Sequence, residues 1–255
     1  RINQDVTIPI ALEHCYNTGR VDNFKKAGGL MPGYFNTQFT FDDTDIYKII
    51  EGASYSIQMF PSEELDARMD TLIYYIQKAQ EPDGYLFTPR TAGEPNKLHD
   101  WVGKERWEKD PDLSHELYNC GHLYEAAVAH YQATGKRILL DIAIKNADVL
   151  VKDFGPGKLA YEPGHQIVEM GLTKMYRVTG KKEYLDLAKF FLDLKGKGYR
   201  GEYSQTHKPV VEQDEAVGHA VRAAYMYSGM ADVAALTGNE AYLRAIDRIW
   251  DNVVS

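Results

Sequence analysis

An internal repeat constrains the fold of this chain more than any other feature of its sequence. The pair Gly-His occurs as Gly121-His122, Gly164-His165 and Gly218-His219, and each pair opens a segment whose apolar residues have helical spacing. The three segments end in Thr-Gly, so that Gly135, Gly180 and Gly238 are predicted helix C-caps, where glycine adopts the left-handed conformation that closes a helix. Repeats of this size stack on one another to bury a shared core.

A second amphipathic helix follows each repeat, which makes each unit a helical hairpin. The second helices are expected at Arg137–Val151, Lys182–Leu194 and Glu240–Val254, and a more divergent hairpin at Asp45–Met59 and Glu63–Gln80. The pattern predicts an all-α chain with about four hairpins, each with an inner and an outer helix. Because six such hairpins close an (α/α)6 toroid, we expect residues 1–255 to form an incomplete toroid, part of one larger domain.

The composition excludes several classes of partner. The 29 Lys and Arg residues are outnumbered by 37 Asp and Glu, giving a net charge of −8, whereas binding to nucleic acid or anionic lipid needs a basic surface. No apolar run approaches the roughly 18 residues of a membrane span. The 18 tyrosines combine an apolar ring with a hydroxyl, which suits a sugar but equally suits a helix interface.

The three repeated histidines are the strongest candidates for a site. If inner helices start around one mouth of a toroid, then His122, His165 and His219 converge there, each at the start of its helix. Imidazoles can bind sugar hydroxyls or transfer protons near neutral pH, and the alternative is that each bonds only to nearby backbone. HxH and HExxH spacings are absent, so we predict no metal site in this chain.

Acidic residues and cysteines form a second set of candidates. Two carboxyl groups are the usual machinery for cleaving a glycosidic bond, but capping and surface charge explain most acidic side chains. Both interpretations stay open for Asp83, Glu116, Glu125, Glu169 and Glu215, and for the Asp42, Asp43 and Asp45 group ahead of a helix. Cys15 and Cys120 are expected to be buried and inert. Two long connections, 85–107 and 196–211, have the length typical of functional loops.

Several motifs, taken in order, resemble glycoside hydrolase family 127, the β-L-arabinofuranosidases. They are Gly19–Phe24, Asp43–Lys48, Ala79–Leu86, His115–Leu123, Gly218–Ala223 and Gly229–Ala234. The resemblance spans nearly the whole chain. It implies an (α/α)6 catalytic domain followed by β-sandwich domains, and a retaining hydrolase of plant-derived glycans.

The resemblance also implies which residues act and which are missing. The family uses a zinc-bound cysteine thiolate as nucleophile and a glutamate as acid/base, and all of these residues are expected beyond residue 255. Zinc is therefore expected in the full-length protein, with no ligand in this chain, and the chain alone is expected to be inactive. His122, His165 and His219 match family histidines that contact the arabinose ring, and Asp45 is a weaker match.

Two rival functions stay open at this point: a sugar 2-epimerase-like toroid enzyme, and a non-catalytic glycan-binding toroid. The expected partner is an oligosaccharide containing L-arabinofuranose, with no nucleic acid and no membrane, and a homodimer is possible. The resemblance does not fix the location of the protein, since members of the family occur in the bacterial cytoplasm and in the periplasm.

Overall fold

The computed structural model describes residues 2–197 and 200–255, and in this part of the chain it contains helices and irregular segments but no β-strand. Two isolated β-bridges, Glu94 to Lys97 and Phe154 to Leu159, are the extended pairings found there. The all-α prediction is therefore confirmed. The chain divides into two compact units, Arg1–Val149 and Leu150–Ser255, which are described separately.

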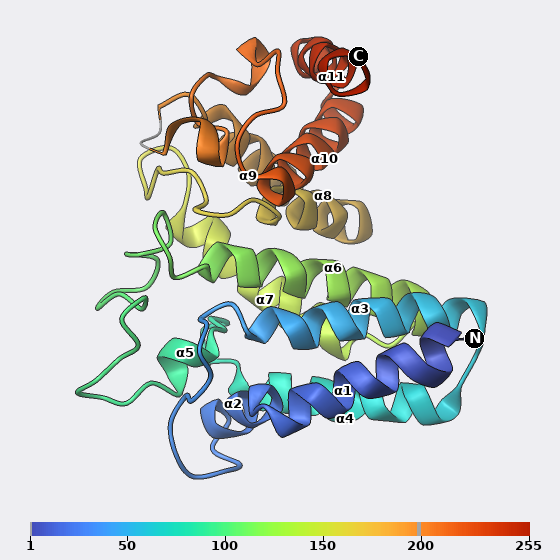
Figure 1. Ribbon diagram of the computed structural model, residues 1–255. Helices are drawn as coiled ribbons and strands as arrows, with labels where there is room; N and C mark the ends of the chain where they lie inside the picture. Colours follow the sequence, from blue (N-terminus) through green and yellow to red (C-terminus); the bar gives the residue numbers. More distant parts are fainter. Residues whose placement is uncertain (1, 198–199) are drawn as a thin grey trace. The chain divides into compact units, whose positions relative to one another are not determined.

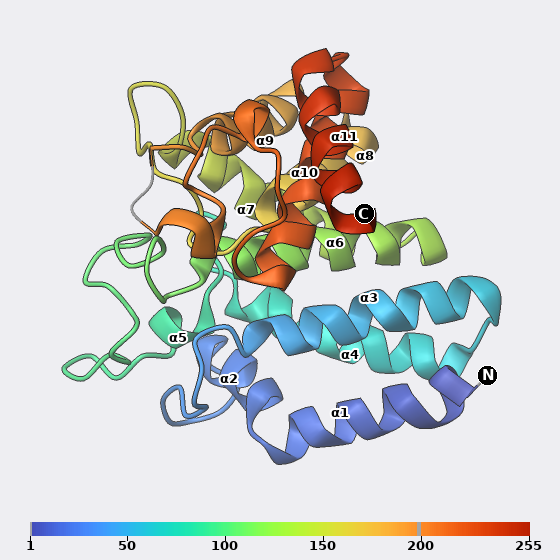
Figure 2. The ribbon, with the colours of Figure 1, turned by 45° about the horizontal axis from the view of Figure 1, so that its top comes forward.

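The first unit is built around helix α3, which packs along α6 on one side and has α1 on its other side (Figures 1 and 2). A long irregular segment, drawn in green, joins α5 to α6. The helices of this unit are the π-helical turn η1 (Asn3–Thr7), α1 (Ile8–Asn17), α2 (Arg20–Ala27), α3 (Asp43–Met59), α4 (Glu63–Ala79), α5 (Thr88–Thr91), α6 (Glu116–Thr134) and most of α7 (Ile138–Asp153).

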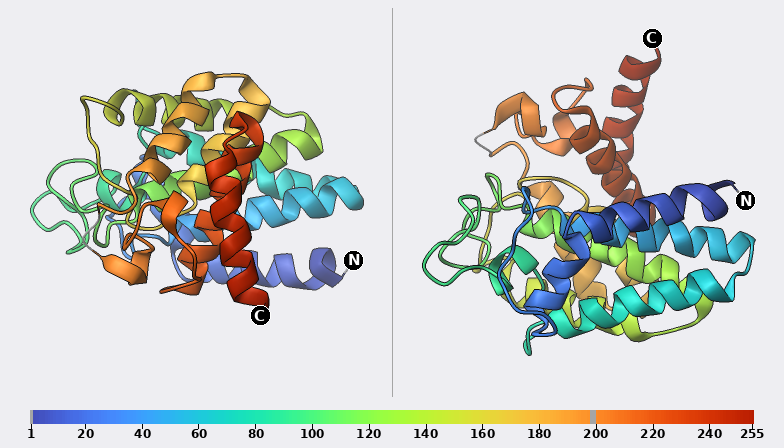
Figure 3. Two further views of the ribbon diagram at one scale, coloured as in Figure 1. Left: turned by 90° about the horizontal axis from the view of Figure 1, so that it is seen from above. Right: turned by 60° about the horizontal axis from the view of Figure 1, so that its bottom comes forward.

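The second unit is built around α10, which contacts α8, α9 and α11. The described part of the connection between α9 and α10 is irregular and carries two short 3₁₀ turns, drawn in orange in Figure 3. The elements of this unit are α8 (Val168–Thr179), α9 (Lys182–Asp193), η2 (Gly201–Ser204), η3 (Val210–Glu212), α10 (Ala220–Thr237) and α11 (Glu240–Val254).

The four predicted hairpins are present as α3–α4, α6–α7, α8–α9 and α10–α11. All three Thr-Gly glycines are left-handed C-caps, with φ of 73° at Gly135, 73° at Gly180 and 69° at Gly238. Glycine is favoured at these positions because φ near +70° is strained for residues with a Cβ. The repeat therefore predicted where the inner helices end.

The predicted starts of the inner helices are wrong in two of three cases. Helix α6 begins at Glu116, because the carboxylate of Asp110 accepts a hydrogen bond from the Leu117 amide at 2.8 Å and satisfies a first-turn donor. Helix α8 begins only at Val168, because Ile167 has the non-helical φ of 141°. Only α10 begins where predicted, immediately after His219.

The outer helices bury their apolar stripes as expected, with one exception. Leu65, Met69 and Leu72 on α4 are buried, as are the corresponding residues of α7. On α11, however, Val253 is 58% exposed beside Trp250 at 63%. The apolar surface of α11 is therefore wider than the part covered by its own unit. No helix in the described part of the chain is long and apolar enough to cross a lipid bilayer.

Candidate functional site

The three repeated histidines occupy three different local positions. His122 lies in the second turn of α6 and is 3% exposed. His165 lies in the loop before α8, also buried, and His219 is the N-cap of α10. The Nδ1 atom of His219 accepts a hydrogen bond from the Arg222 amide at 3.4 Å, so this imidazole satisfies the first turn of its own helix.

Two of these histidines meet inside the second unit. The ring centroids of His165 and His219 are 5.9 Å apart, with the rings at 74° to each other. The Nδ1 atom of His165 lies 2.8 Å from the backbone carbonyl of Gln166, which assigns the proton to Nδ1. An edge-to-face pair of imidazoles brings hydrogen-bond donor and acceptor nitrogens close together.

Aromatic and basic side chains surround the pair. Tyr225 lies 6.1 Å from His165 and Tyr203 5.6 Å from His219, measured between ring centroids. The guanidinium of Arg222 lies 5.2 Å from the Tyr203 centroid and donates a hydrogen bond to the carbonyl of Gly164. Rings and hydroxyls at this spacing match the apolar faces and hydroxyls of a sugar.

Three buried glutamines, Gln166, Gln205 and Gln213, join the loops that carry the two histidines; we call them the glutamine clasp. Gln166 Nε2 donates to the Ser204 carbonyl at 2.9 Å and to Gln205 Oε1 at 3.1 Å. Gln205 Nε2 donates to the carbonyls of Val217 at 2.9 Å and His219 at 3.3 Å. Gln213 Nε2 donates to the Gln205 carbonyl at 2.9 Å. All three side chains donate hydrogen bonds to loop backbone, and Gln205 also accepts one through its amide oxygen, so the clasp holds these loops in place.

Backbone strain lies next to the same loop. Ile167, which follows Gln166, is buried and has φ of 141°, a value that a β-branched residue rarely adopts. The carboxylate of Glu169 accepts a hydrogen bond from the Ile167 amide at 3.2 Å. Strained residues of this kind persist where the surrounding contacts over-determine them, and they cluster at binding sites.

Glu169 itself lies in a charged interior. Burial raises the pKa of its carboxyl, and the nearby Lys195 ammonium opposes that rise. Lys195 is 1% exposed, and burial lowers its pKa despite Glu169 and Glu162. Glu162 belongs to the loop that carries His165, and Glu169 lies in the first turn of the helix that follows it.

The first unit holds the third histidine at the end of an aromatic wall. The wall consists of six side chains in successive ring contact: Phe39, Phe41, Trp101, His115, Tyr118 and His122. The closest of these contacts joins Tyr118 and His122, whose ring centroids are 4.6 Å apart. Lys48 Nζ donates to the Tyr118 hydroxyl at 3.1 Å and lies 5.1 Å from its ring centroid. Phe39, Phe41, Trp101 and His115 are partly exposed, whereas Tyr118 and His122 are buried. Partly exposed rings near a cation are suited to a carbohydrate chain.

Asp45, the fourth predicted sugar ligand, lies in the first turn of α3. Its carboxylate forms an ion pair with Arg20 at 2.5 Å and is 38% exposed. Arg20 also reaches Asp42 at 3.2 Å, so both carboxylates tie α2 to the start of α3. Asp43 accepts two hydrogen bonds from Thr88, and burial raises its pKa to about 7. The contacts of the Asp42 to Asp45 group favour a structural role.

The other predicted carboxylates have mainly structural contacts as well. Asp83 forms an ion pair with Arg106 at 2.5 Å, and Glu215 is exposed on a loop. Glu116 is buried and accepts hydrogen bonds from the Tyr85 hydroxyl at 2.8 Å and the Trp107 amide at 2.7 Å. Glu125 is buried within α6. Glu116 thus anchors the long loop before α6.

Neither cysteine has the character of a nucleophile. Burial raises the pKa of Cys15 to about 11 and that of Cys120 well above its usual value, so both stay thiols near neutral pH. They lie on different helices, α1 and α6, and both are free and buried. A zinc site built on glutamate and cysteines does not fit the donors that the described residues bring together.

Sequence reasoning missed Tyr203, Tyr225, Arg222 and the glutamine clasp. The available signal was the long connection 196–211, which contains Tyr203 and Gln205. The connection 85–107 likewise supplies Trp101 to the aromatic wall.

Comparison with known proteins places the chain in a family. A family model described as the β-L-arabinofuranosidase GH127 catalytic domain matches residues 1–255. The chain is 36% identical to a non-reducing end β-L-arabinofuranosidase of Bifidobacterium longum subsp. longum, over 92% of this chain and 38% of that protein.

Solved structures agree with that match. A GH127 β-arabinofuranosidase superimposes with a TM-score of 0.93 at 59% identity, covering 99% of this chain and 40% of its own. A GH127 β-L-arabinofuranosidase from Geobacillus stearothermophilus T6 gives 0.89 at 37% identity, covering 98% and 42%. The chain thus spans about two fifths of the length of these relatives. On this match over its entire length, the chain belongs to the GH127 β-L-arabinofuranosidase catalytic-domain family.

Proposed function

We propose that this chain is the sugar-binding part of a retaining glycoside hydrolase that releases β-L-arabinofuranose from plant-derived glycans. Family membership supports the reaction class. The observation that carries the assignment to these residues is the His165 and His219 pair, held by the glutamine clasp and flanked by Tyr203 and Tyr225.

In this proposal the residues of the chain bind and orient the sugar. His165 and His219 exchange hydrogen bonds with ring hydroxyls, and Tyr203 packs against an apolar sugar face. His122 and the aromatic wall provide a second surface, and Asp45 is a weaker ligand because Arg20 already engages it. A sugar held in one orientation presents its anomeric carbon consistently to the catalytic groups.

The catalytic groups themselves are proposed to lie outside residues 1–255. Cys15 and Cys120 do not offer the thiolate that the family chemistry uses, so we derive no bond-making step from this chain. We further propose that residues 1–255 form an incomplete toroid, which the rest of the longer protein completes.

The test is hydrolysis of an aryl β-L-arabinofuranoside by the full-length protein carrying single substitutions. We expect His165→Ala and His219→Ala to lower kcat/KM by about 10- to 100-fold, the effect of losing one or two sugar hydrogen bonds. His14→Ala on the exposed face of α1 is the matched control and should leave kcat/KM unchanged.

Each rival function has its own outcome. Epimerisation of a free sugar without hydrolysis would support the epimerase-like alternative. Binding of arabinose-containing oligosaccharide with no turnover by the full-length protein would support a glycan-binding module. Turnover of other glycosides but of no L-arabinofuranoside would refute the proposed substrate.

A further inference from the structure

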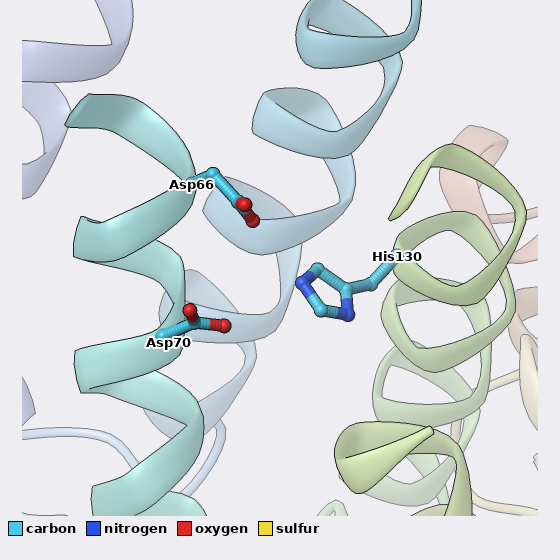
Figure 4. A group of neighbouring side chains, drawn as sticks. All are labelled: Asp66, Asp70 and His130. Carbon is cyan, nitrogen blue, oxygen red and sulfur yellow. The ribbon is translucent and has the colours of Figure 1, made fainter. Parts of the chain in front are cut away.

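A second cluster of polar side chains lies at the other end of α6, away from His122. Asp66 and Asp70 are one turn apart on α4, and His130 lies near the C-terminal end of α6. One ligand atom from each residue lies within 4.8 Å of the other two. Figure 4 shows the imidazole of His130 extending from α6 toward the two carboxylates.

Three buried atoms of this cluster point to a ligand. Both ring nitrogens of His130 are buried without a hydrogen-bond partner among the described residues, and the side chain is 1% exposed. Asp66 Oδ1 is buried without a partner in the same way. A buried polar atom left unpaired is costly, so native proteins satisfy it with a protein group, an ordered water or a bound ion.

The chemistry of the donors is that of a metal site. A neutral imidazole offers a nitrogen lone pair, and both ring nitrogens of His130 are without a hydrogen-bond partner among the described residues. A neutral imidazole and two carboxylates are ligands that zinc and similar divalent transition metals accept, with water completing the coordination. Metal–ligand bonds of about 2.0–2.2 Å require the ligand atoms to lie closer to one another than they do here. In this proposal the aspartate side chains rotate to bring them together.

Lys136 now neutralises the two carboxylates. Its Nζ atom lies 2.8 Å from Asp66 Oδ2 and 2.6 Å from Asp70 Oδ2. The lysine side chain is 36% exposed, so it can move into water when a divalent cation takes its place. Lys136 therefore competes with a metal for the same oxygens.

We propose that Asp66, Asp70 and His130 bind a divalent transition-metal ion such as zinc, which joins α4 to α6 and displaces Lys136. This site lies within the first unit and is independent of the proposed glycosidase function. The proposal departs from the expectation that the chain holds no metal ligands.

The test measures zinc affinity by competition with a chromophoric chelator, and cobalt binding by its visible absorption. We expect His130→Ala and Asp66→Asn to weaken zinc binding by at least about tenfold, and Lys136→Met to strengthen it by a similar factor. The controls are His14→Ala and Lys152→Met, which should leave the affinity unchanged. Zinc should also raise the Tm of the parent chain and not that of His130→Ala.

Opposite results overturn the proposal. Equal zinc affinity for the parent chain and His130→Ala would show that the imidazole is not a ligand. If Lys136→Met binds zinc no better than the parent, the cluster is an ordinary ion-pair network. Asp70→Asn alters the half-exposed carboxylate and serves as the second variant if His130→Ala fails to fold.

Discussion

Glu116 is a single carboxyl group that holds the long loop before α6. It accepts hydrogen bonds from the Tyr85 hydroxyl and the Trp107 amide, and Trp107 has the left-handed φ of 68°. Burial, with the charge of Asp110, raises the pKa of Glu116 to about 8. The charge of Glu116 therefore bears on the loop that it holds.

The sign of this effect gives a prediction. Since the folded pKa is above the ordinary value of 4.5, the stability that Glu116 contributes is complete below about pH 4.5 and is lost as pH rises through 8. Glu116→Gln does not titrate, so we expect the Tm of the parent to fall relative to that of the variant between pH 5 and 9. Glu215→Gln, on an exposed loop, is the control. A constant Tm difference across this range would contradict the raised pKa.

The histidines also illustrate what can be read from residues alone. The sequence identifies the histidines as candidates and predicts that the cysteines are inert. It does not predict the groups that surround the histidines, because these contacts join distant parts of the chain: Gln166 and Gln205 are 39 positions apart, and Arg222 and Gly164 are 58 apart. Contacts between distant loops depend on packing, which has no local pattern.

Among the elements, the glycines of the repeat act in two different ways. A Cβ on Gly218 would lie 2.0 Å from the Glu202 carbonyl oxygen, whereas a Cβ on Gly238 would meet nothing within 4 Å. Gly218 therefore allows two stretches of backbone to approach, and it places His219 where its amide donates to the Tyr203 carbonyl at 3.1 Å. At Gly238 glycine is favoured only because the backbone adopts a left-handed φ.

These roles predict unequal costs of substitution. Gly238→Ala should lower the free energy of unfolding by about 1 kcal/mol, the strain of one left-handed residue. Gly218→Ala should cost at least about 2–4 kcal/mol, because backbone must move as well, and should raise KM in the full-length enzyme by displacing His219. Chemical denaturation and sugar kinetics measure the two effects. Equal costs for both variants would disprove the distinction.

The helix boundaries show the same division between local and distant causes. Ends of inner helices depend on a local Thr-Gly signal and were predicted correctly. Starts depend on remote groups, such as the Asp110 carboxylate for α6, or on strain at Ile167 for α8, and two of three were predicted wrongly. The histidines therefore share a sequence motif without sharing a position in their helices.

At the scale of the whole molecule, the uncovered side of α11 bears on the toroid. Trp250, Val253 and Val254 are 63%, 58% and 58% exposed, on a helix that otherwise packs against α10. In the proposed toroid a following hairpin of the longer protein covers this surface. Replacing an apolar residue of this size changes the free energy of unfolding little when the side chain is exposed to solvent. The same replacement lowers it strongly when another part of the protein buries the side chain.

This contrast can be measured with Trp250→Lys. In the 255-residue chain the change should alter the unfolding free energy by less than about 0.5 kcal/mol. In the full-length protein it should destabilise by about 3–5 kcal/mol, the cost of losing a buried tryptophan. Tyr74→Lys, on the exposed face of α4, is the control and should change the unfolding free energy equally in the 255-residue chain and in the full-length protein. A small effect of Trp250→Lys in the full-length protein would mean that no hairpin covers α11.

The open Thr-Gly turns have a practical consequence for labelling. A side chain at Gly135, Gly180 or Gly238 would face empty space, and the 18 residues of α10 separate Gly238 from His219 by about 27 Å. Because Cys15 and Cys120 are buried with raised pKa values, a cysteine inserted at one of these turns would be the most reactive thiol of the chain. A fluorophore attached there could follow sugar binding from a distance without touching the histidines.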